Sequence, residues 1–202
     1  MGFLFVGGWV DLNMVNRIML LLLFLSGINA QIALPTFQGV HKPHTTTSGT
    51  PENPLGSNIS ATHTGSNWNY MMGYRFTPQV NGTITQLGGY YSGTRTVRLW
   101  QRSNQSFLGS VSVTSSYNWS YADLASSVSV TSGTEYIVAV CLTGSGGAYN
   151  STWNGPHTYG NILVSYTCWK SNYNSDSYPS WTRENYTYHM YGMADITFVP
   201  DS

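Results

Sequence analysis

Residues 81–100 of this 202-residue chain read NGTITQLGGYYSGTRTVRLW, and their alternating apolar and polar side chains indicate strands. Val97 and Leu99 share one parity, whereas Arg98 and Trp100 share the other. Because side chains alternate across a strand, Val97 and Leu99 face a core and Arg98 and Trp100 face the opposite side. We therefore expect Trp100 on an open face of the sheet, in contact with a sugar or a partner subunit, unless a loop covers it.

The preceding stretch, Thr83–Tyr91, is bounded by the turn signals Asn81-Gly82 and Ser92-Gly93. Its large apolar residues, Ile84 and Leu87, have opposite parities, which predicts a bulge or a strand covered on both sides. The two stretches are thus expected to be adjacent strands of an antiparallel sheet.

Beyond residue 67, strand and turn signals alternate and no amphipathic helix is evident. This pattern predicts an all-β fold, an antiparallel, jelly-roll-like β-sandwich of about eight strands. The strand at Glu135–Leu142 is apolar on both parities, so it should be central. The other candidate strands are Tyr70–Phe76, Thr83–Tyr91, Thr94–Gln101, Phe107–Val113, Trp119–Leu124, Ile162–Cys168 and Met193–Val199.

The N-terminal part of the chain reads as a targeting segment and an arm. Arg17 supplies a basic start, residues 18–25 are apolar, and Ala30 suits cleavage, so residues 1–30 are predicted to be a secretory signal peptide with a mis-called extension before Met14. The protein is therefore expected outside the cell or at its surface. Residues 31–66 hold four prolines and few large apolar residues, which predicts a flexible Pro/Thr-rich arm before a domain at 67–202.

Charge and hydropathy exclude several partners. Removing Arg17 and Asp11 from eight basic and eight acidic residues leaves seven of each, so the mature chain is neutral. A neutral chain lacks the basic footprint that nucleic acid or anionic lipid would require. After the signal, no segment is long or apolar enough to span a membrane.

Cysteines and asparagines suggest two modifications of a secreted protein. Cys141 and Cys168 each lie near the end of an apolar strand, and an oxidising compartment favours a disulfide between them over two buried thiols. Six N-x-S/T sequons permit glycosylation, at Asn58, Asn81, Asn104, Asn118, Asn150 and Asn185.

An ordered set of short segments resembles a known module. Gly73-Tyr74-Arg75-Phe76 is followed by the segments 80–87, 97–100, 128–136 and 194–198. Together they resemble an extracellular β-sandwich module of bacterial secreted proteins, catalogued as a domain of unknown function, over residues 70–199. The resemblance implies a sandwich fold and an extracellular setting, often beside carbohydrate-binding or immunoglobulin-like modules, and it implies no particular activity.

The residues do not indicate catalysis, a cofactor or a metal. The chain has no HExxH and no GxSxG motif. Asp176 and Glu184 lie close together in a loop, but a glycosidase needs two opposed carboxylates at a set separation. His41, His44 and His63 fall in or beside the flexible arm, where solvated histidines are expected rather than ligands.

Aromatic residues are dense between 149 and 191, much of it loop-like sequence. Flat rings cover apolar sugar faces while polar side chains bond the hydroxyls, which favours a non-catalytic glycan-binding or adhesive module that binds a polysaccharide or glycoconjugate. The rings alternatively pack the loop onto the sandwich. The candidate contacts are Trp100, Trp169, Tyr173, Tyr178, Trp181 and Arg183.

A second class of function remains open. Only 8% of residues are charged, which lowers repulsion between copies of the chain. The protein would then be a structural subunit of an extracellular filament or surface layer, with residues 31–40 completing a neighbour's sheet. An arm that packs on its own domain would argue against this alternative.

Overall fold

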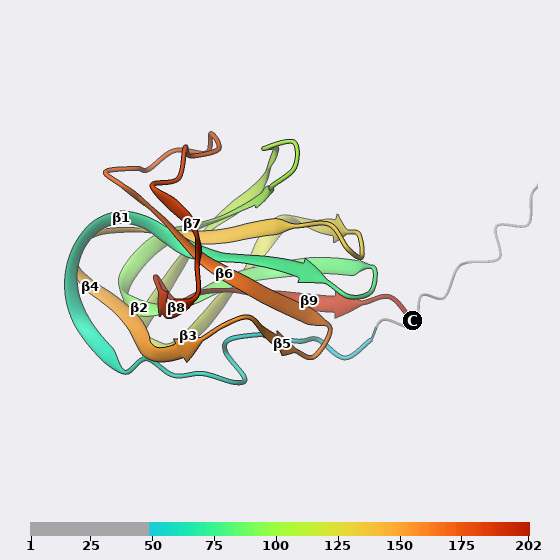
Figure 1. Cartoon of the computed structure of the whole chain (residues 1–202), viewed down its shortest axis with the longest axis horizontal. Coiled ribbons are helices and arrows are strands. Elements are labelled where there is room, and N and C mark those ends of the chain that lie inside the picture. Colours follow the sequence, from blue (N-terminus) through green and yellow to red (C-terminus); the bar gives the residue numbers. More distant parts are fainter. Residues whose placement is uncertain (1–48) are drawn as a thin grey trace, which may run out of the picture. The chain divides into compact units, whose positions relative to one another are not determined.

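The computed structural model describes residues 49–202, which form nine strands and no helix (Figure 1). The predicted signal peptide and residues 31–48 of the predicted arm lie outside this range. No helical segment within it has the length and apolar character that crossing a bilayer requires. The strands are β1 (His63–Pro78), β2 (Gly82–Gln101), β3 (Phe107–Val130), β4 (Tyr136–Asn154), β5 (His157–Tyr159), β6 (Ile162–Ser171), β7 (Arg183–Tyr186), β8 (Tyr188–Tyr191) and β9 (Ala194–Pro200).

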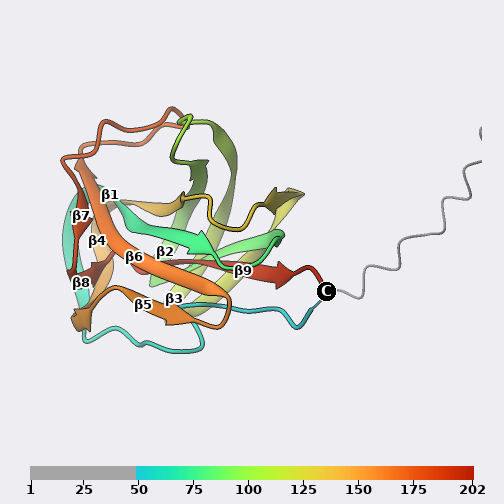
Figure 2. The ribbon, with the colours of Figure 1, turned by 45° about the vertical axis from the view of Figure 1, so that its right-hand side comes forward.

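All strand pairs are antiparallel, in the order β3-β2-β4-β1-β6-β5, with β7 on β6, β8 on β4 and β9 on β2. The strand β2 changes partner along its length, because residues 82–89 pair with β9 and residues 97–101 pair with β4. The sheet therefore divides into two layers, which enclose an interior in the view of Figure 2. The prediction of an all-β antiparallel sandwich is confirmed.

The strands are longer than the sequence pattern predicts. Thr83–Tyr91 and Thr94–Gln101 belong to the single strand β2, which continues through Gly93 at a φ of +90°. In β4, Gly144 and Gly146 adopt φ values of +72° and +101°. Glycine takes these left-handed conformations without a Cβ penalty, so the chain bends while strand pairing continues. Glycines that signal turns in the sequence are bends within strands in the fold.

Two detailed expectations are confirmed. The register of β2 shifts between Ile84 and Gln86 against both neighbours, which is the predicted bulge. Because of this bulge, Ile84 and Leu87 enter the same core despite their opposite parities. The segment Tyr136–Leu142 is buried throughout and pairs with both β1 and β2, as a central strand does.

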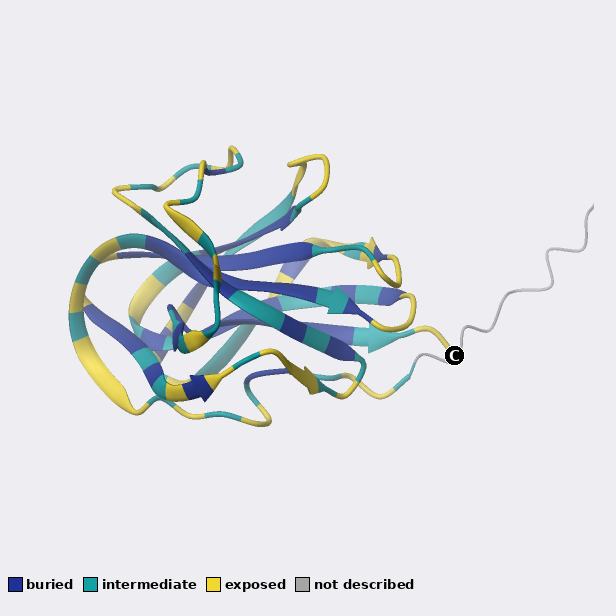
Figure 3. Ribbon diagram, in the orientation of Figure 1, coloured by how far each residue is buried: buried dark blue, intermediate teal, exposed yellow. Residues whose placement is uncertain are grey.

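The main core lies between the two layers. Val97, Leu99 and Val138 enter it from one layer, and Phe198 and Ile196 enter it from β9. Buried segments of the long strands follow the interior in Figure 3, and exposed residues gather at turns and strand ends. At about 25 cal/mol for each square ångström of apolar surface buried, this core is the main source of stability.

Residues 49–66 correct the expected domain boundary. Leu55 is fully buried in the main core, and β1 begins at His63. Glu52 exchanges two backbone hydrogen bonds with Phe198 of β9, and the Gly49 amide donates to the Pro200 carbonyl at 2.9 Å. The expectation of a flexible arm over 31–66 is therefore wrong for residues 49–66, because one buried leucine and a free strand edge anchor them.

A buried carboxylate also anchors residues 55–56 to β9. Asp195 is fully buried and accepts hydrogen bonds from the hydroxyls of Tyr74 (2.9 Å) and Tyr121 (2.7 Å). It also accepts from the backbone amides of Leu55 (3.2 Å) and Gly56 (2.7 Å). Burial raises the pKa of Asp195, and the hydrogen bonds from Tyr121, Gly56 and Tyr74 only partly offset that effect.

Candidate functional site

A second, smaller apolar cluster lies on the outer face of the layer formed by β1, β4, β6 and the second half of β2. Alternation along each strand places Trp100, Met71, Ile137, Cys141 and Cys168 there. A loop of residues 172–182, between β6 and β7, covers this cluster and is called the covering loop below. It packs against the cluster through Tyr173, Tyr178 and Trp181.

Trp100 is the centre of this outer cluster. It faces away from Val97 and Leu99, as its parity predicts, but its exposed fraction is 0%. Its ring meets Tyr178 and Trp181 edge-on, with centroid separations of 6.5 Å and 6.2 Å. The expectation of an open contact tryptophan is therefore wrong for Trp100, because the covering loop buries it.

Polar contacts hold the covering loop at a fixed place. The Trp100 indole N–H donates to the Asp176 carbonyl at 2.9 Å, and Arg98 Nε pairs with the Asp176 carboxylate at 2.7 Å. Trp100 and Arg98 stand on the same face of β2, so a single loop residue bonds to both. At the end of the loop, the Thr182 amide donates to the Trp169 carbonyl at 3.0 Å.

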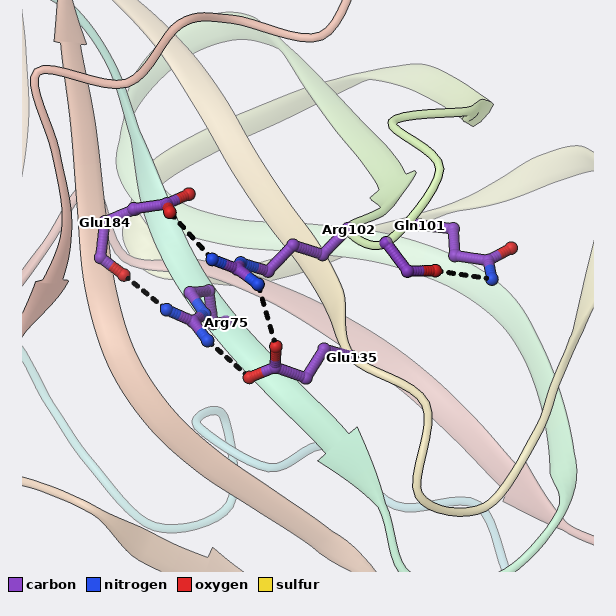
Figure 4. Close-up of polar contacts among 6 residues, drawn as sticks. Arg75, Gln101, Arg102, Glu135 and Glu184 are labelled. Atoms are coloured by element: carbon purple, nitrogen blue, oxygen red, sulfur yellow. Dashed lines mark hydrogen bonds and ion pairs between the residues drawn. The ribbon is translucent and has the colours of Figure 1, made fainter.

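Beside the loop lies a network of two arginines and two glutamates, shown in Figure 4. Arg102 pairs with Glu135 at 3.2 Å and with Glu184 at 2.8 Å, while Arg75 pairs with Glu135 and donates to the Glu184 carbonyl at 3.1 Å. The hydrogen bond that Arg102 donates to the Glu184 carboxylate raises the pKa of Arg102. Two positive and two negative charges cancel, so the network is electrically neutral and rigid.

A cleft of about 520 Å³ opens next to this network. Its walls are the covering loop and the β2–β3 turn of residues 102–106, which lie side by side at the top of Figures 1 and 2. The two rings in the wall stand at 89° to each other, with centroids 6.2 Å apart. The lining residues are Arg102, Ser103, Gln105, Tyr178, Pro179, Ser180, Trp181 and Glu184.

Gln105, at the rim of the cleft, adopts a φ of +59°. A long side chain rarely takes this left-handed conformation, which costs about 1 kcal/mol or more. The neighbouring Asn104 side chain accepts from the Ser106 amide at 3.0 Å and holds the turn in this shape. Strain of this kind gathers at binding sites, where the surrounding structure keeps a side chain in place.

The structure separates the predicted contact residues into two groups. Tyr178 and Trp181 line the cleft, and Tyr173 of the same loop packs against the outer cluster. Trp169 and Arg183 belong to a different group of rings, where the Arg183 guanidinium lies 5.8 Å from the Trp169 ring centroid. Sequence reasoning missed the other lining residues, which are Arg102, Ser103, Gln105, Pro179, Ser180 and Glu184.

Cys141 and Cys168 are both buried and not bonded to each other, so the predicted disulfide is wrong. Cys141 pairs with Met71 and Cys168 pairs with Gly73, on opposite sides of β1. Two strand spacings alone place their Cα atoms at least about 9.6 Å apart, and a disulfide requires Cα atoms within about 7 Å. Burial raises the pKa of both thiols and keeps them protonated.

The sequons differ in accessibility. Asn58, Asn81, Asn104, Asn118 and Asn185 are exposed, and their glycosylation stays a prediction. Asn150 is 7% exposed, donates to the Ser60 carbonyl at 2.7 Å and accepts from the Thr152 amide at 2.8 Å. A glycan on Asn150 is incompatible with this fold, so the prediction is wrong at that position. No group of three or more His, Cys, Asp or Glu side chains within 49–202 is placed to hold a metal ion.

Fold and site together define the class of molecule: an antiparallel β-sandwich that carries an aromatic cleft under one long loop. The chain belongs to the family described as Domain of unknown function (DUF4082), whose model matches residues 57–191. This match confirms the expected resemblance to a catalogued domain of unknown function. No curated protein matches the sequence.

Proposed function

We propose that this domain is a non-catalytic, extracellular glycan-binding module and that the cleft is its binding site. One observation carries the proposal: Tyr178 and Trp181 form a ring-lined wall directly beside the ion pair of Arg102 and Glu184. Rings cover the apolar faces of a sugar, and charged groups with fixed positions accept and donate to its hydroxyls. The serine and glutamine side chains of the lining add further hydrogen-bonding groups.

The charges of the cleft indicate what kind of sugar it suits. Arg102 is neutralised by Glu135 and Glu184, so no net charge faces the cleft from this network. A neutral saccharide matches such a surface better than an anionic one, because an anion would compete with two carboxylates for the same arginine. The ligand proposed for the cleft is therefore a neutral polysaccharide or glycoconjugate.

Absence of catalysis is part of the proposal. A glycosidase needs one carboxylic acid to protonate a leaving group and a second carboxylate opposite it. Here Glu184 is held by Arg102 and Asp176 is held by Arg98. Glu184 is the only carboxylate among the residues that line the cleft, so the lining does not present the required pair.

The alternative of a filament subunit draws no support from the described residues. Its joining segment, residues 31–40, lies outside them. The part of the arm that the structure describes pairs with the domain's own strand β9. Binding is therefore the better-supported function.

Affinity electrophoresis of the full chain in gels that contain neutral polysaccharides tests the proposal. We expect at least one neutral polysaccharide to retard the wild type. Trp181→Ala should weaken that retardation by about 2 kcal/mol, or about thirtyfold in affinity. Val80→Ala is the control, because Val80 is an exposed apolar side chain outside the cleft. Equal losses in both variants, or no retardation in any neutral polysaccharide, would contradict the proposal.

A further inference from the structure

A second group of rings lies away from the cleft. Six rings, called the aromatic patch, form a continuous series of contacts: Trp68, Tyr149, Trp169, Tyr186, Tyr188 and Tyr191. They come from β1, β4, β6, β7 and β8. Separations between contacting centroids include 5.2 Å for Trp169 and Tyr186 and 5.7 Å for Tyr149 and Tyr191.

The patch is a surface as well as a packing layer. Trp68, Trp169 and Tyr191 pack against the main core and none of them is fully buried. Tyr188 is 59% exposed, the largest exposure of any large apolar side chain within 49–202. Ring clusters of this size that remain open to solvent usually mark a binding surface.

The charge at the patch differs from that of the cleft. The Arg183 guanidinium lies 5.8 Å from the centroids of both Trp169 and Tyr186. Arg183 is exposed and forms no ion pair with any other described residue, whereas Arg75, Arg98 and Arg102 each have a carboxylate partner. The next residue along the chain, Glu184, directs its carboxylate to Arg102.

Two histidines also lie beside rings of the aromatic patch. His63 stacks on Tyr149 with ring centroids 4.5 Å apart and an interplanar angle of 8°. His189 Nδ1 lies 3.0 Å from the Tyr191 hydroxyl. The guanidinium and the two imidazole rings thus place polar nitrogen atoms around the patch, and no described carboxylate pairs with them.

We infer that the aromatic patch is a second, separate binding site, for an acidic saccharide whose carboxylate pairs with Arg183. Sugar faces stack on Tyr188 and its neighbours, and the uncompensated guanidinium supplies the charge that the neutral cleft lacks. On β7, Glu184 lines the cleft and Arg183 lies beside the patch rings, and the two sites share no residue. One domain would then bind two chemically different parts of a polysaccharide matrix.

Titration of the full chain with defined saccharides tests this inference. The probes are an oligogalacturonate, its methyl ester and polyglutamate, which present rings with charge, rings without charge, and charge without rings. We expect the oligogalacturonate to bind best and to lose affinity as salt screens the charge. Arg183→Gln and Tyr188→Ala should each weaken that binding at least about fivefold.

Two control variants distinguish the aromatic patch from the cleft and from general charge attraction. Lys170→Gln removes a positive charge from strand β6, and Trp181→Ala alters the cleft and its packing on Trp100 but no ring of the aromatic patch, so both should bind the oligogalacturonate as the wild type does. Polyglutamate binding as strong as oligogalacturonate binding, or equal losses in Lys170→Gln and Arg183→Gln, would show non-specific charge attraction and overturn the inference. So would an absence of oligogalacturonate binding. Loss in Trp181→Ala alone would assign the acidic saccharide to the cleft instead.

Discussion

Replacing Trp100 by alanine tests the claim that this residue is buried at the centre of the outer cluster. The side chain has no exposed surface, contacts Tyr178, Trp181 and Phe107 edge-on, and donates to the Asp176 carbonyl. Removing a buried tryptophan costs about 3–5 kcal/mol, which includes the cavity it leaves. A lost hydrogen bond contributes about 1 kcal/mol of that total. We expect a loss of about 4 kcal/mol.

Urea and thermal unfolding measure this effect. For a domain of about 150 residues, each kcal/mol lowers the Tm by about 2–4 °C, so the melting temperature of Trp100→Ala should fall by roughly 10 °C or more. Phe107→Ala is the matched control, because Phe107 touches the same indole but is 40% exposed, and it should cost about 1 kcal/mol. A loss below 1 kcal/mol in Trp100→Ala would refute the burial argument, and a fully native variant that no longer binds sugar would restore Trp100 as a contact residue.

Three further predictions concern separate parts of the domain. Alkylation of the unfolded protein without reductant should label both Cys141 and Cys168, and reductant should leave the Tm unchanged. If a disulfide were present, reduction would instead lower the free energy of unfolding by about 3 kcal/mol. Gln105→Gly should raise stability by about 0.5–1 kcal/mol in urea unfolding, because glycine accepts the φ of +59° without strain, and a loss of stability would contradict this. Asp195→Asn should cost about 2 kcal/mol near neutral pH, since an amide cannot accept from all four donors. Burial raises the pKa of Asp195 in the folded state above its unfolded value of about 3.9. The free energy of unfolding of the wild type, relative to Asp195→Asn, should therefore increase as pH falls toward that value. A difference that shrinks on acidification would contradict this prediction.

Local alternation predicted much of the sheet. The bulge after Ile84, the central strand at 136–142 and the side on which Trp100 stands all follow from a period of two residues. Strand length could not be predicted in the same way, because a glycine such as Gly93 has the same local signature in a turn and in a bend. The short strands β7 and β8 were missed, since closely spaced tyrosines hide any alternation.

The site was only partly predictable, because it depends on segments that are far apart in the sequence. Tyr178 and Trp181 were expected as contacts from their loop-like surroundings, and they do line the cleft. Arg102 and Glu184 are 82 residues apart, and no local sequence pattern indicates that they form an ion pair. The cysteines show the same limit: their separation depends on β1 lying between β4 and β6, an order that no residue near either thiol encodes.

The hydrogen bonds that join residues 49–52 to β9 also determine how the domain would respond to mechanical tension. The Gly49 amide bonds to the Pro200 carbonyl and Glu52 bonds to Phe198, so Gly49 and Pro200 lie together at one end of this antiparallel pair. A force that pulls these two ends apart breaks the bonds one after another, from Gly49 inward, instead of shearing them all at once. Opening then reaches Leu55 and draws it from the main core. We expect the domain to begin unravelling from its ends at low force, while the cleft and the aromatic patch, formed by other strands, keep their shape.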